Sequence, residues 1–327
     1  MLKYIHEFLF YEVIQLITIF KSNTSGLLTE VDSIEHGSWI SMINPSDEEV
    51  LLITQKLNIP QDFIRAALDE EEGSRIEFEN NATLVIIDIP FTEIDDNSLT
   101  YDTYPLAIIY TESVIITVCL KNSPVLSDFA LEKISSFYTF KKVRFMLQIL
   151  YRASNYYLLY LRQINKKSLL IEKTLYKSLK NRELIQLFAL QKSLVYFSTS
   201  LKSNDLTFEK LLKQEILTKY DDDRDILDDV MIENRQAIEM CNIYSDVLTG
   251  TMDVFASIIS NNQNQVMKYL TSVTIVISIP TLISGLLGMN VGGIPFFNSS
   301  DGFFYMCIIV ALITIAVIIY LRNKDMF

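Results

Sequence analysis

The sequence predicts an α+β membrane protein with an N-terminal cytosolic α/β domain, a long α-helical stalk and two C-terminal transmembrane helices. Three observations predict this class. Short runs rich in Ile, Val and Thr alternate with helix starts in the first 126 residues. A long stretch with an apolar period near 3.5 follows from about residue 220 and contains no proline until Pro280. Two uncharged apolar runs then end the chain.

The first part, residues 1–126, has the pattern of an α/β domain. One helix starts at residues 44–49, with acidic side chains in its first turn, and another starts at Ile59-Pro60 and runs to about Leu68. Runs separated by turn residues predict the strands of a largely antiparallel or mixed sheet. These runs cover residues 16–21, 38–43, 75–78, 82–90, 104–110 and 113–119.

The apolar N-terminus resembles a signal peptide, but two acidic residues argue against one. Glu7 and Glu12 interrupt the run, and no small-residue cleavage site follows. Residues 1–14 are therefore either a non-native start or an extra N-terminal segment.

The middle of the chain is predicted to be helical. Residues 127–203 contain few helix breakers, and turns are expected near residues 180–182 and 202–205. Residues 204–268 form the predicted stalk, whose long helix begins between Tyr220 and Arg224. Such a helix cannot bury its apolar stripe alone, so we expect it to pack against its own chain and against copies of the chain.

Two runs at the C-terminal end are predicted to cross a membrane. Residues 269–287 and 303–321 are each 19 residues long and carry no charge. As helices they would span about 28 Å, close to the hydrocarbon thickness of a bilayer. Basic residues flank their inner ends, whereas the loop 288–302 has a single charge, Asp301. The positive-inside rule therefore places both termini, including the tail 322–327, in the cytoplasm and the loop outside.

The first of these runs carries hydroxyl side chains, which either let helices pack closely or line a wet path. Their spacing favours the wet path, because residues seven apart stay on one face of a supercoiled helix. One such row begins with acidic residues and continues through the predicted span. It comprises Glu239, Asp246, Asp253, Ser260, Met267, Thr274, Thr281 and Gly288.

Composition excludes several classes of function. The net charge of −12 argues against nucleic-acid binding, which needs a basic surface. The three cysteines are scattered and show neither a disulfide framework nor zinc-site spacing. No phosphate loop, nucleophile elbow or zinc-protease motif is present, so we expect neither an enzyme nor an organic cofactor.

The end of the first span carries the sequence Gly288-Met289-Asn290, directly before a short loop and a last apolar run. In this position the motif resembles that of the CorA family of magnesium (divalent metal cation) transporters. The resemblance covers most of the chain and is sharpest over residues 253–295. It implies a multi-pass protein of the plasma (inner) membrane that conducts Mg²⁺ through a homo-oligomeric pore, a homopentamer in this family.

The resemblance also assigns roles to individual residues. Gly288, Met289 and Asn290 correspond to the selectivity filter. Met267 and Leu270 would form an apolar constriction, and Ser278 replaces the bulky apolar residue typical at its position. The complete pore lining implied by the family is Asn264, Met267, Leu270, Thr274, Ser278, Thr281 and Gly285.

Cytosolic acidic residues suggest regulation by Mg²⁺. Asp253 matches an acidic family position that binds Mg²⁺ between neighbouring cytosolic domains. Its candidate partners are Asp69, Glu70, Glu71 and Glu72. The alternative is that such acidic runs are solvated surface. This alternative is favoured for two further cation candidates, the acids of residues 221–223 and 228–229.

Other functions remain open at this point. The protein could transport Co²⁺, Ni²⁺ or Zn²⁺ with the same fold, or it could be a non-conducting membrane-anchored scaffold or sensor. The intact Gly-Met-Asn motif favours Mg²⁺ import over zinc export. Hydroxyl side chains in heptad register favour a conducting protein over a scaffold.

Overall fold

The structure is a computed structural model that describes residues 17–95, 98–134, 137–175, 181–214, 220–289, 301–324 and 326. The chain divides into two compact units, Met1–Gly250 and Thr251–Phe327, and each is described by itself. The elements of the first unit are β1 (Ile17–Ser22), β2 (Leu28–Glu30), β3 (Trp39–Ile43), α2 (Asp47–Leu57), α3 (Gln61–Arg65), η1 (Ala66–Leu68), β4 (Arg75–Glu79), β5 (Ala82–Asp95), β6 (Ser98–Tyr110), β7 (Ile115–Cys119), α4 (Pro124–Ala130), α5 (Lys142–Leu175) and α6 (Asn181–Leu212). The helix α7 (Asp221–Leu287) begins in the first unit and ends in the second, which also contains α8 (Gly302–Asn323).

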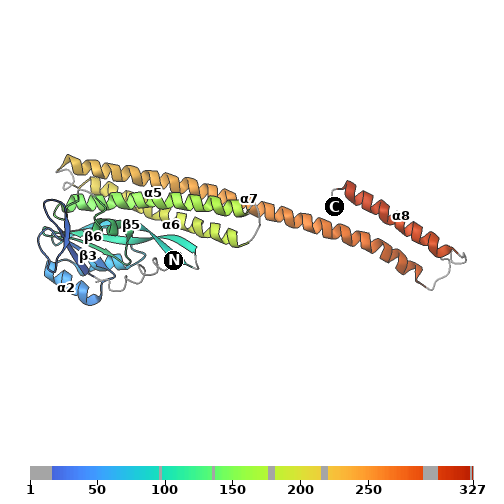
Figure 1. Cartoon of the computed structure of the whole chain (residues 1–327), viewed down its shortest axis with the longest axis horizontal. Helices are drawn as coiled ribbons and strands as arrows, with labels where there is room; N and C mark the ends of the chain where they lie inside the picture. The colour runs from blue at the N-terminus through green and yellow to red at the C-terminus, as the bar shows by residue number, and fades with distance from the viewer. Residues whose placement is uncertain are drawn as a thin grey trace. The chain divides into compact units, whose positions relative to one another are not determined.

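The described strands form one seven-stranded sheet in the order β2-β1-β3-β7-β6-β5-β4 (Figure 1). The β3–β7 pair is parallel, with Trp39 opposite Ile115, and the other neighbours are antiparallel. The prediction of a mixed sheet is therefore confirmed. Alternate residues of each strand face opposite sides. As a result, the sheet buries one apolar layer beneath α2 and α3 and another beneath α4 and α5.

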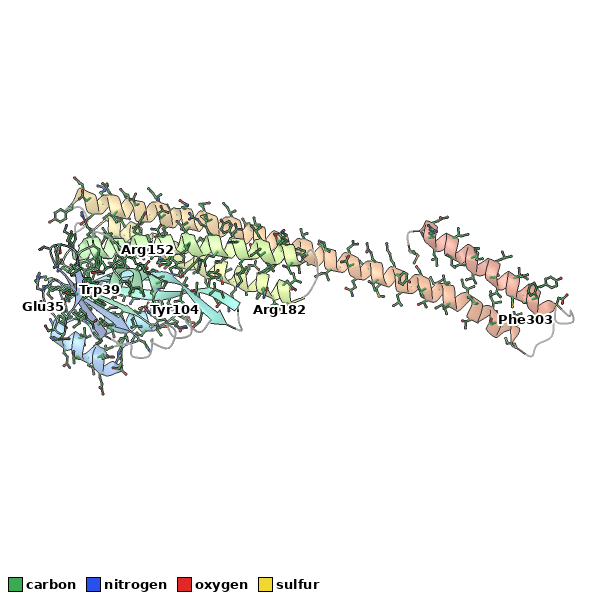
Figure 2. All side chains as sticks on the ribbon, viewed as in Figure 1. Glu35, Trp39, Tyr104, Arg152, Arg182 and Phe303 are labelled. Atoms are coloured by element: carbon green, nitrogen blue, oxygen red, sulfur yellow. The ribbon has the colours of Figure 1, made fainter. Side chains whose placement is uncertain are left out.

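Trp39 illustrates how the second layer is fixed (Figure 2). Its side chain is fully buried, and its ring packs edge-on against Phe145 of α5 with ring centroids 5.1 Å apart. The indole Nε1–H donates a hydrogen bond of 2.8 Å to Thr117 Oγ1 on β7. A buried indole needs such a partner, so this contact sets both the depth and the orientation of the ring.

The start of α2 agrees with the prediction from its sequence. Ser46 caps the helix, and its side chain and that of Glu49 each bond the other residue's backbone N–H, which forms a capping box. The helix ends at Asn58, which adopts a left-handed conformation with φ of 52°. Asparagine tolerates this conformation better than most residues.

The turn predicted near residues 202–205 is wrong, because α6 continues to Leu212. Asn204 is buried inside the helix, where its Nδ2 donates to the Asp88 carbonyl at 2.8 Å. Its Oδ1 accepts from the Asp88 backbone N–H at 2.9 Å. The polar side chain therefore attaches α6 to β5 and does not end the helix. The long helix starts at Asp221, within the predicted interval. The helical region predicted from about residue 127 begins with α4 and continues with α5 from Lys142.

Within the first unit, α6 and α7 run antiparallel beside each other (Figure 1). Gln191 Nε2 donates to Thr249 Oγ1 at 2.9 Å, and Asn234 Nδ2 donates to the Leu201 carbonyl at 3.1 Å. Cys241 Sγ donates to the Leu194 carbonyl at 3.0 Å. These bonds fix the axial register of the two helices.

Candidate functional site

Among the described elements, α7 and α8 are long and apolar enough to cross a membrane. In the second unit, α8 lies beside the C-terminal part of α7. A shallow groove between them is lined by Pro280, Ser284 and Leu287 of α7 and by residues of α8 that include Met306. The half-buried or buried residues of α8 recur every three or four positions, as expected for one packed helix face. They are Gly302, Met306, Val310, Thr314, Val317 and Leu321.

One face of α7 is covered by α8 and its C-terminal continuation. Ser272 is fully buried on this face, and its hydroxyl lies 2.7 Å from the Met326 carbonyl. Ser284 lines the groove toward α8. For Ser272 the close-packing explanation of the hydroxyl residues holds, whereas Ser284 stays exposed. The half-buried residues of the same face are Val273, Val276, Ile279, Pro280, Ile283 and Leu287.

The opposite face of α7 carries the predicted pore lining. At about 100° per residue, these positions fall within an arc of about 120°. The structure therefore brings them together on one side of the helix, facing away from α8. All are exposed in the single chain: Asn264, Met267, Leu270, Thr274, Ser278, Thr281 and Gly285.

The threonines of this face satisfy their own protons. Thr271 donates to the Met267 carbonyl, Thr274 to the Leu270 carbonyl and Thr281 to the Ile277 carbonyl, at 2.8, 2.8 and 2.9 Å. Each hydroxyl oxygen keeps free lone pairs once its proton is used. The face therefore presents hydrogen-bond acceptors, which suit the water molecules around a cation.

The Gly-Met-Asn motif ends the helix. The Gly288 N–H donates to the Ser284 carbonyl at 3.0 Å, and the Met289 N–H donates to the Leu286 carbonyl at 3.4 Å. A Cβ on Gly288 would lie 3.4 Å from the Ser284 carbonyl oxygen, so a small residue fits this turn. Asn290 lies outside the described residues, and the filter prediction remains a prediction.

The predicted regulatory acids lie in different units. Asp253 is exposed in the second unit, where it lines a shallow groove with Ser257 and Asn261. The other candidates, Asp69, Glu70, Glu71 and Glu72, form the turn before β4 in the first unit. No group of three or more His, Cys, Asp or Glu side chains that could hold a metal is found in the described part of the chain.

Two of the four turn acids have local partners. Asp69 Oδ1 accepts from the Glu71 backbone N–H at 3.0 Å, and Glu72 forms an ion pair with Arg75. Both contacts stabilise the turn between η1 and β4. Glu70 and Glu71 are exposed, so their carboxylates are the more accessible pair for a cation.

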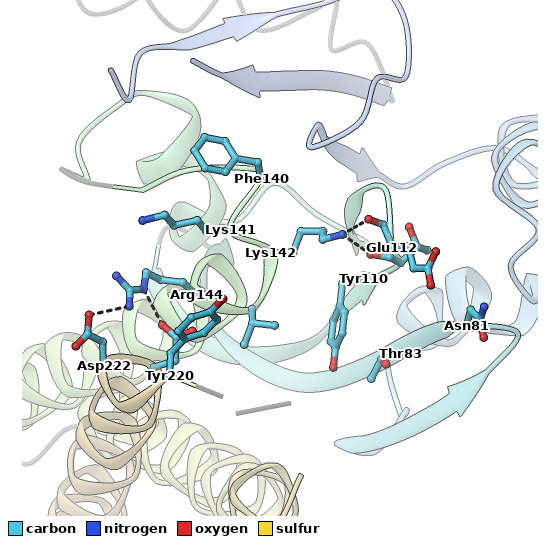
Figure 3. Close-up of a pocket in the computed structure, with 13 residues that line it drawn as sticks. Asn81, Thr83, Tyr110, Glu112, Phe140, Lys141, Lys142, Arg144, Tyr220 and Asp222 are labelled. Carbon is cyan, nitrogen blue, oxygen red and sulfur yellow. Dashed lines mark hydrogen bonds and ion pairs between the residues drawn. The ribbon is translucent and has the colours of Figure 1, made fainter. Parts of the chain in front are cut away.

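A cavity of about 790 Å³ in the first unit contains further charged residues (Figure 3). Arg144 donates to Asp223 at 2.7 Å and to Asp222 at 3.2 Å, and Lys142 donates to the carbonyls of Thr111 and Glu112. Two of the three acids at residues 221–223, considered as cation ligands from the sequence, therefore pair with Arg144. The sequence did not reveal this partner, because Arg144 lies on α5, far from these acids in the chain.

The family model for "CorA-like Mg2+ transporter protein" matches residues 35–323. The cobalt/magnesium transport protein CorA of Methanocaldococcus jannaschii is 28% identical over 295 residues, which are 87% of this chain and 90% of that protein. The magnesium transport protein CorA of Helicobacter pylori is 24% identical over 294 residues, which are 88% of this chain and 89% of that protein.

Solved structures share the fold. The complete structure of the CorA magnesium transporter from Methanocaldococcus jannaschii superimposes with a TM-score of 0.80 at 23% identity, covering 95% of this chain and 98% of that one. The full-length CmaX protein gives a TM-score of 0.69 at 16% identity, with coverage of 95% and 99%. An α/β domain, a long helix and two apolar C-terminal helices are thus common to these proteins. With the match extending over most of its length, the chain belongs to the family of CorA-like Mg²⁺ transporter proteins, which are ion transporters and not enzymes.

Proposed function

We propose that this protein is a homopentameric channel that conducts Mg²⁺ into the cytosol and closes when cytosolic Mg²⁺ is high. One observation carries the proposal: the exposed face of α7, opposite α8, holds all seven residues expected to line a pore. A helix face that presents hydroxyl oxygens with free lone pairs is unfavourable in lipid, because lipid tails offer no hydrogen-bond donors. It becomes favourable when copies of the chain turn it toward a shared water-filled axis.

A ring of copies is needed because two helices cannot enclose a channel. Identical subunits related by rotation would each contribute one α7. Mg²⁺ sheds its water reluctantly and usually keeps several water molecules. The outward lone pairs of Thr274 and Thr281, and a ring of Asn290 amides, would therefore hold the ion through its water shell.

The direction of flux follows from the membrane potential. Each elementary charge gains about 2.3 kcal/mol per 100 mV, so a divalent cation gains about 4.6 kcal/mol on entering a negative cytosol. No nucleotide is required for this step. In the proposed topology, both termini lie in the cytoplasm and the protein resides in the plasma (inner) membrane.

Closure would combine a constriction with a cytosolic sensor. Met267 and Leu270 lie on the exposed face and would form an apolar ring that blocks ions by dewetting. Asp253 of one copy would share Mg²⁺ with acids of the next copy, among which Glu70 and Glu71 are the accessible candidates. Bound Mg²⁺ would offset the repulsion between these acids and hold the ring closed.

The test is Mg²⁺ uptake into liposomes that contain the purified protein. Asn290→Ala should reduce uptake at least about tenfold, because it removes the amide ring expected at the filter. Asn298→Ala makes the same chemical change elsewhere in the same loop and should leave uptake unchanged. Uptake no greater than that of empty liposomes, from an intact unmodified oligomer, would refute the channel and favour a scaffold or sensor.

A second candidate function is transport of Co²⁺ by the same pore. It is favoured by the name of the Methanocaldococcus jannaschii relative, a cobalt/magnesium transport protein. Competition distinguishes the two ions: external Co²⁺ that enters the liposomes and slows Mg²⁺ uptake indicates a shared path. Ni²⁺ and Zn²⁺ are tested in the same assay.

A further inference from the structure

The outward face of α6 is basic and apolar, although the whole chain carries a net charge of −12. No acidic residue belongs to this face. The acids of α6 at Asp205 and Glu209 lie to one side, where they pair with Arg235 of α7 at 3.5 and 3.1 Å. The α6 face comprises Arg182, Ile185, Phe188, Lys192, Val195, Tyr196, Thr199, Lys202, Leu206, Lys210 and the following Lys213, all exposed.

The outward face of α7 in the same unit is acidic and apolar. At about 100° per residue its exposed positions fall within an arc of about 100°. Ile232 and Ile243 are 62% and 55% exposed, which is unusual for aliphatic side chains in the middle of a long helix. The α7 face comprises Asp225, Asp228, Asp229, Ile232, Gln236, Glu239, Ile243, Asp246, Val247 and Gly250, all exposed.

The hydrogen bonds between α6 and α7 of one chain define which residues lie at the same height. They join Gln191 to Thr249, Leu194 to Cys241 and Leu201 to Asn234. Rotation about an axis parallel to α7 moves a copy around the axis without changing these heights. The register between α6 of one copy and α7 of the next is therefore set by the fold of the single chain.

In this register the two faces are complementary. Lys192 lies at the height of Asp246, and Lys210 at the height of Asp228. Aliphatic residues also meet: Val195 is level with Ile243, and Leu206 is level with Ile232. Phe188, which is 63% exposed, is level with Gly250, a position with no side chain to obstruct the ring. Opposite charges and apolar side chains thus alternate in step along both helices.

We infer that the α6 face of one copy packs against the α7 face of the next copy. Because two different faces meet, the contact is heterologous and closes into a ring after a fixed number of rotations. Burial of the aliphatic residues supplies most of the attraction, and the ion pairs fix the register. The inference rests on the proposed ring of subunits and adds which surfaces hold it together.

Cysteine pairs test the contact and its register in the full-length protein, with Cys307 replaced by Ser. Val195→Cys with Ile243→Cys, and Leu206→Cys with Ile232→Cys, should form disulfides between copies and give a ladder of cross-linked oligomers. Each single variant should give no ladder, since each contact needs one residue from each face.

The matched control uses the same four substitutions with exchanged partners. Val195→Cys with Ile232→Cys, and Leu206→Cys with Ile243→Cys, are offset by about eleven residues, or about 16 Å along the helix. These pairs should not cross-link. Equal ladders from matched and exchanged pairs would overturn the register, and no ladder from any pair would overturn the contact.

Charge exchange provides a second test. Lys192→Glu, added to the variant that carries Val195→Cys and Ile243→Cys, should slow disulfide formation about two- to fivefold. This is the effect expected from losing an exposed ion pair. Adding Asp246→Lys should restore the rate, whereas no restoration would contradict the pairing. Mg²⁺ uptake of the uncross-linked variants is measured separately. If Mg²⁺ uptake depends on Asn290 but no cysteine pair gives a ladder, this interface is refuted and the channel is supported. If the matched pairs give a ladder but the protein shows no uptake, the interface is supported and the channel is refuted.

Discussion

At the scale of single residues, a half-buried carboxylate, Asp88, and a buried one, Asp128, have opposite effects on the fold. Burial raises the pKa of Asp88 above its ordinary value of 3.8, and a hydrogen bond donated by the Ser200 side chain offsets this only in part. Burial alone would also raise the pKa of Asp128. Hydrogen bonds from Tyr156, Arg152 and Lys133 outweigh that effect and hold the pKa of Asp128 below 3.8. Ionised Asp88 therefore costs stability, whereas ionised Asp128 supplies it.

The two carboxylates predict opposite dependences on pH. Asp88→Asn should raise the melting temperature at pH 7. The gain should shrink as the pH falls through the raised pKa, because the native carboxyl is then protonated as well. Asp128→Asn should lower the unfolding free energy by about 2 kcal/mol at pH 7, and this loss should shrink at acidic pH. Thermal unfolding between pH 2 and pH 8 checks both, because the Asp128 effect changes only as the pH falls below about 4. Differences that do not vary with pH over this range would contradict the assignment.

At the scale of the element, the hydroxyls on the two sides of the apolar helix pair permit a clean comparison. Thr274 on the exposed face of α7 and Thr314 in the α8 groove each donate to their own helix at 2.8 Å. They differ in whether water can reach the lone pairs. Thr274→Val should lower Mg²⁺ uptake about fivefold, the effect of losing about 1 kcal/mol of hydrogen bonding to the hydrated ion. Thr314→Val should leave uptake unchanged, and equal effects would place the pore elsewhere.

Most strands and helix starts could be predicted at this scale, because each follows from local patterns. β2 was missed because a three-residue edge strand has no detectable period. The extended β5–β6 hairpin was predicted too short, since polar residues such as Glu93 and Asp102 interrupt its apolar alternation while still pairing across the strands. The predicted position of the end of α6 is wrong, because the hydrogen-bond partner of Asn204 lies on β5, far away in the sequence.

The candidate site was predictable to a different extent. The resemblance to the CorA family implied seven pore-lining residues of α7, and the structure places all seven on one exposed face of that helix. Helical spacing separates Thr274 from Ser272, which lies about 200° away around the helix, but it does not reveal that α8 covers the Ser272 side. The regulatory acids were beyond sequence reasoning for another reason: their proposed site is shared between chains.

At the scale of the whole molecule, the proposed sensor would link the cytosolic Mg²⁺ concentration to conduction through the pore. Asp253→Ala should leave uptake active at a high internal Mg²⁺ concentration that closes the unmodified channel, because the shared ion no longer offsets repulsion between copies. Uptake into liposomes preloaded with Mg²⁺ measures this. Asp32→Ala removes another exposed carboxylate and should retain normal closure. Unchanged inhibition of the Asp253 variant would remove that residue from the sensor.

The parallel pairing of β3 with β7 has a consequence for biosynthesis. At the centre of the sheet β3 pairs with β7, and Trp39 lies opposite Ile115. One edge of β3 therefore has no partner strand until the ribosome has released residue 119. Nonlocal pairing of this kind is slow and exposes the nascent chain to aggregation. Both apolar C-terminal segments emerge much later. The sheet can therefore be complete before either apolar segment leaves the ribosome.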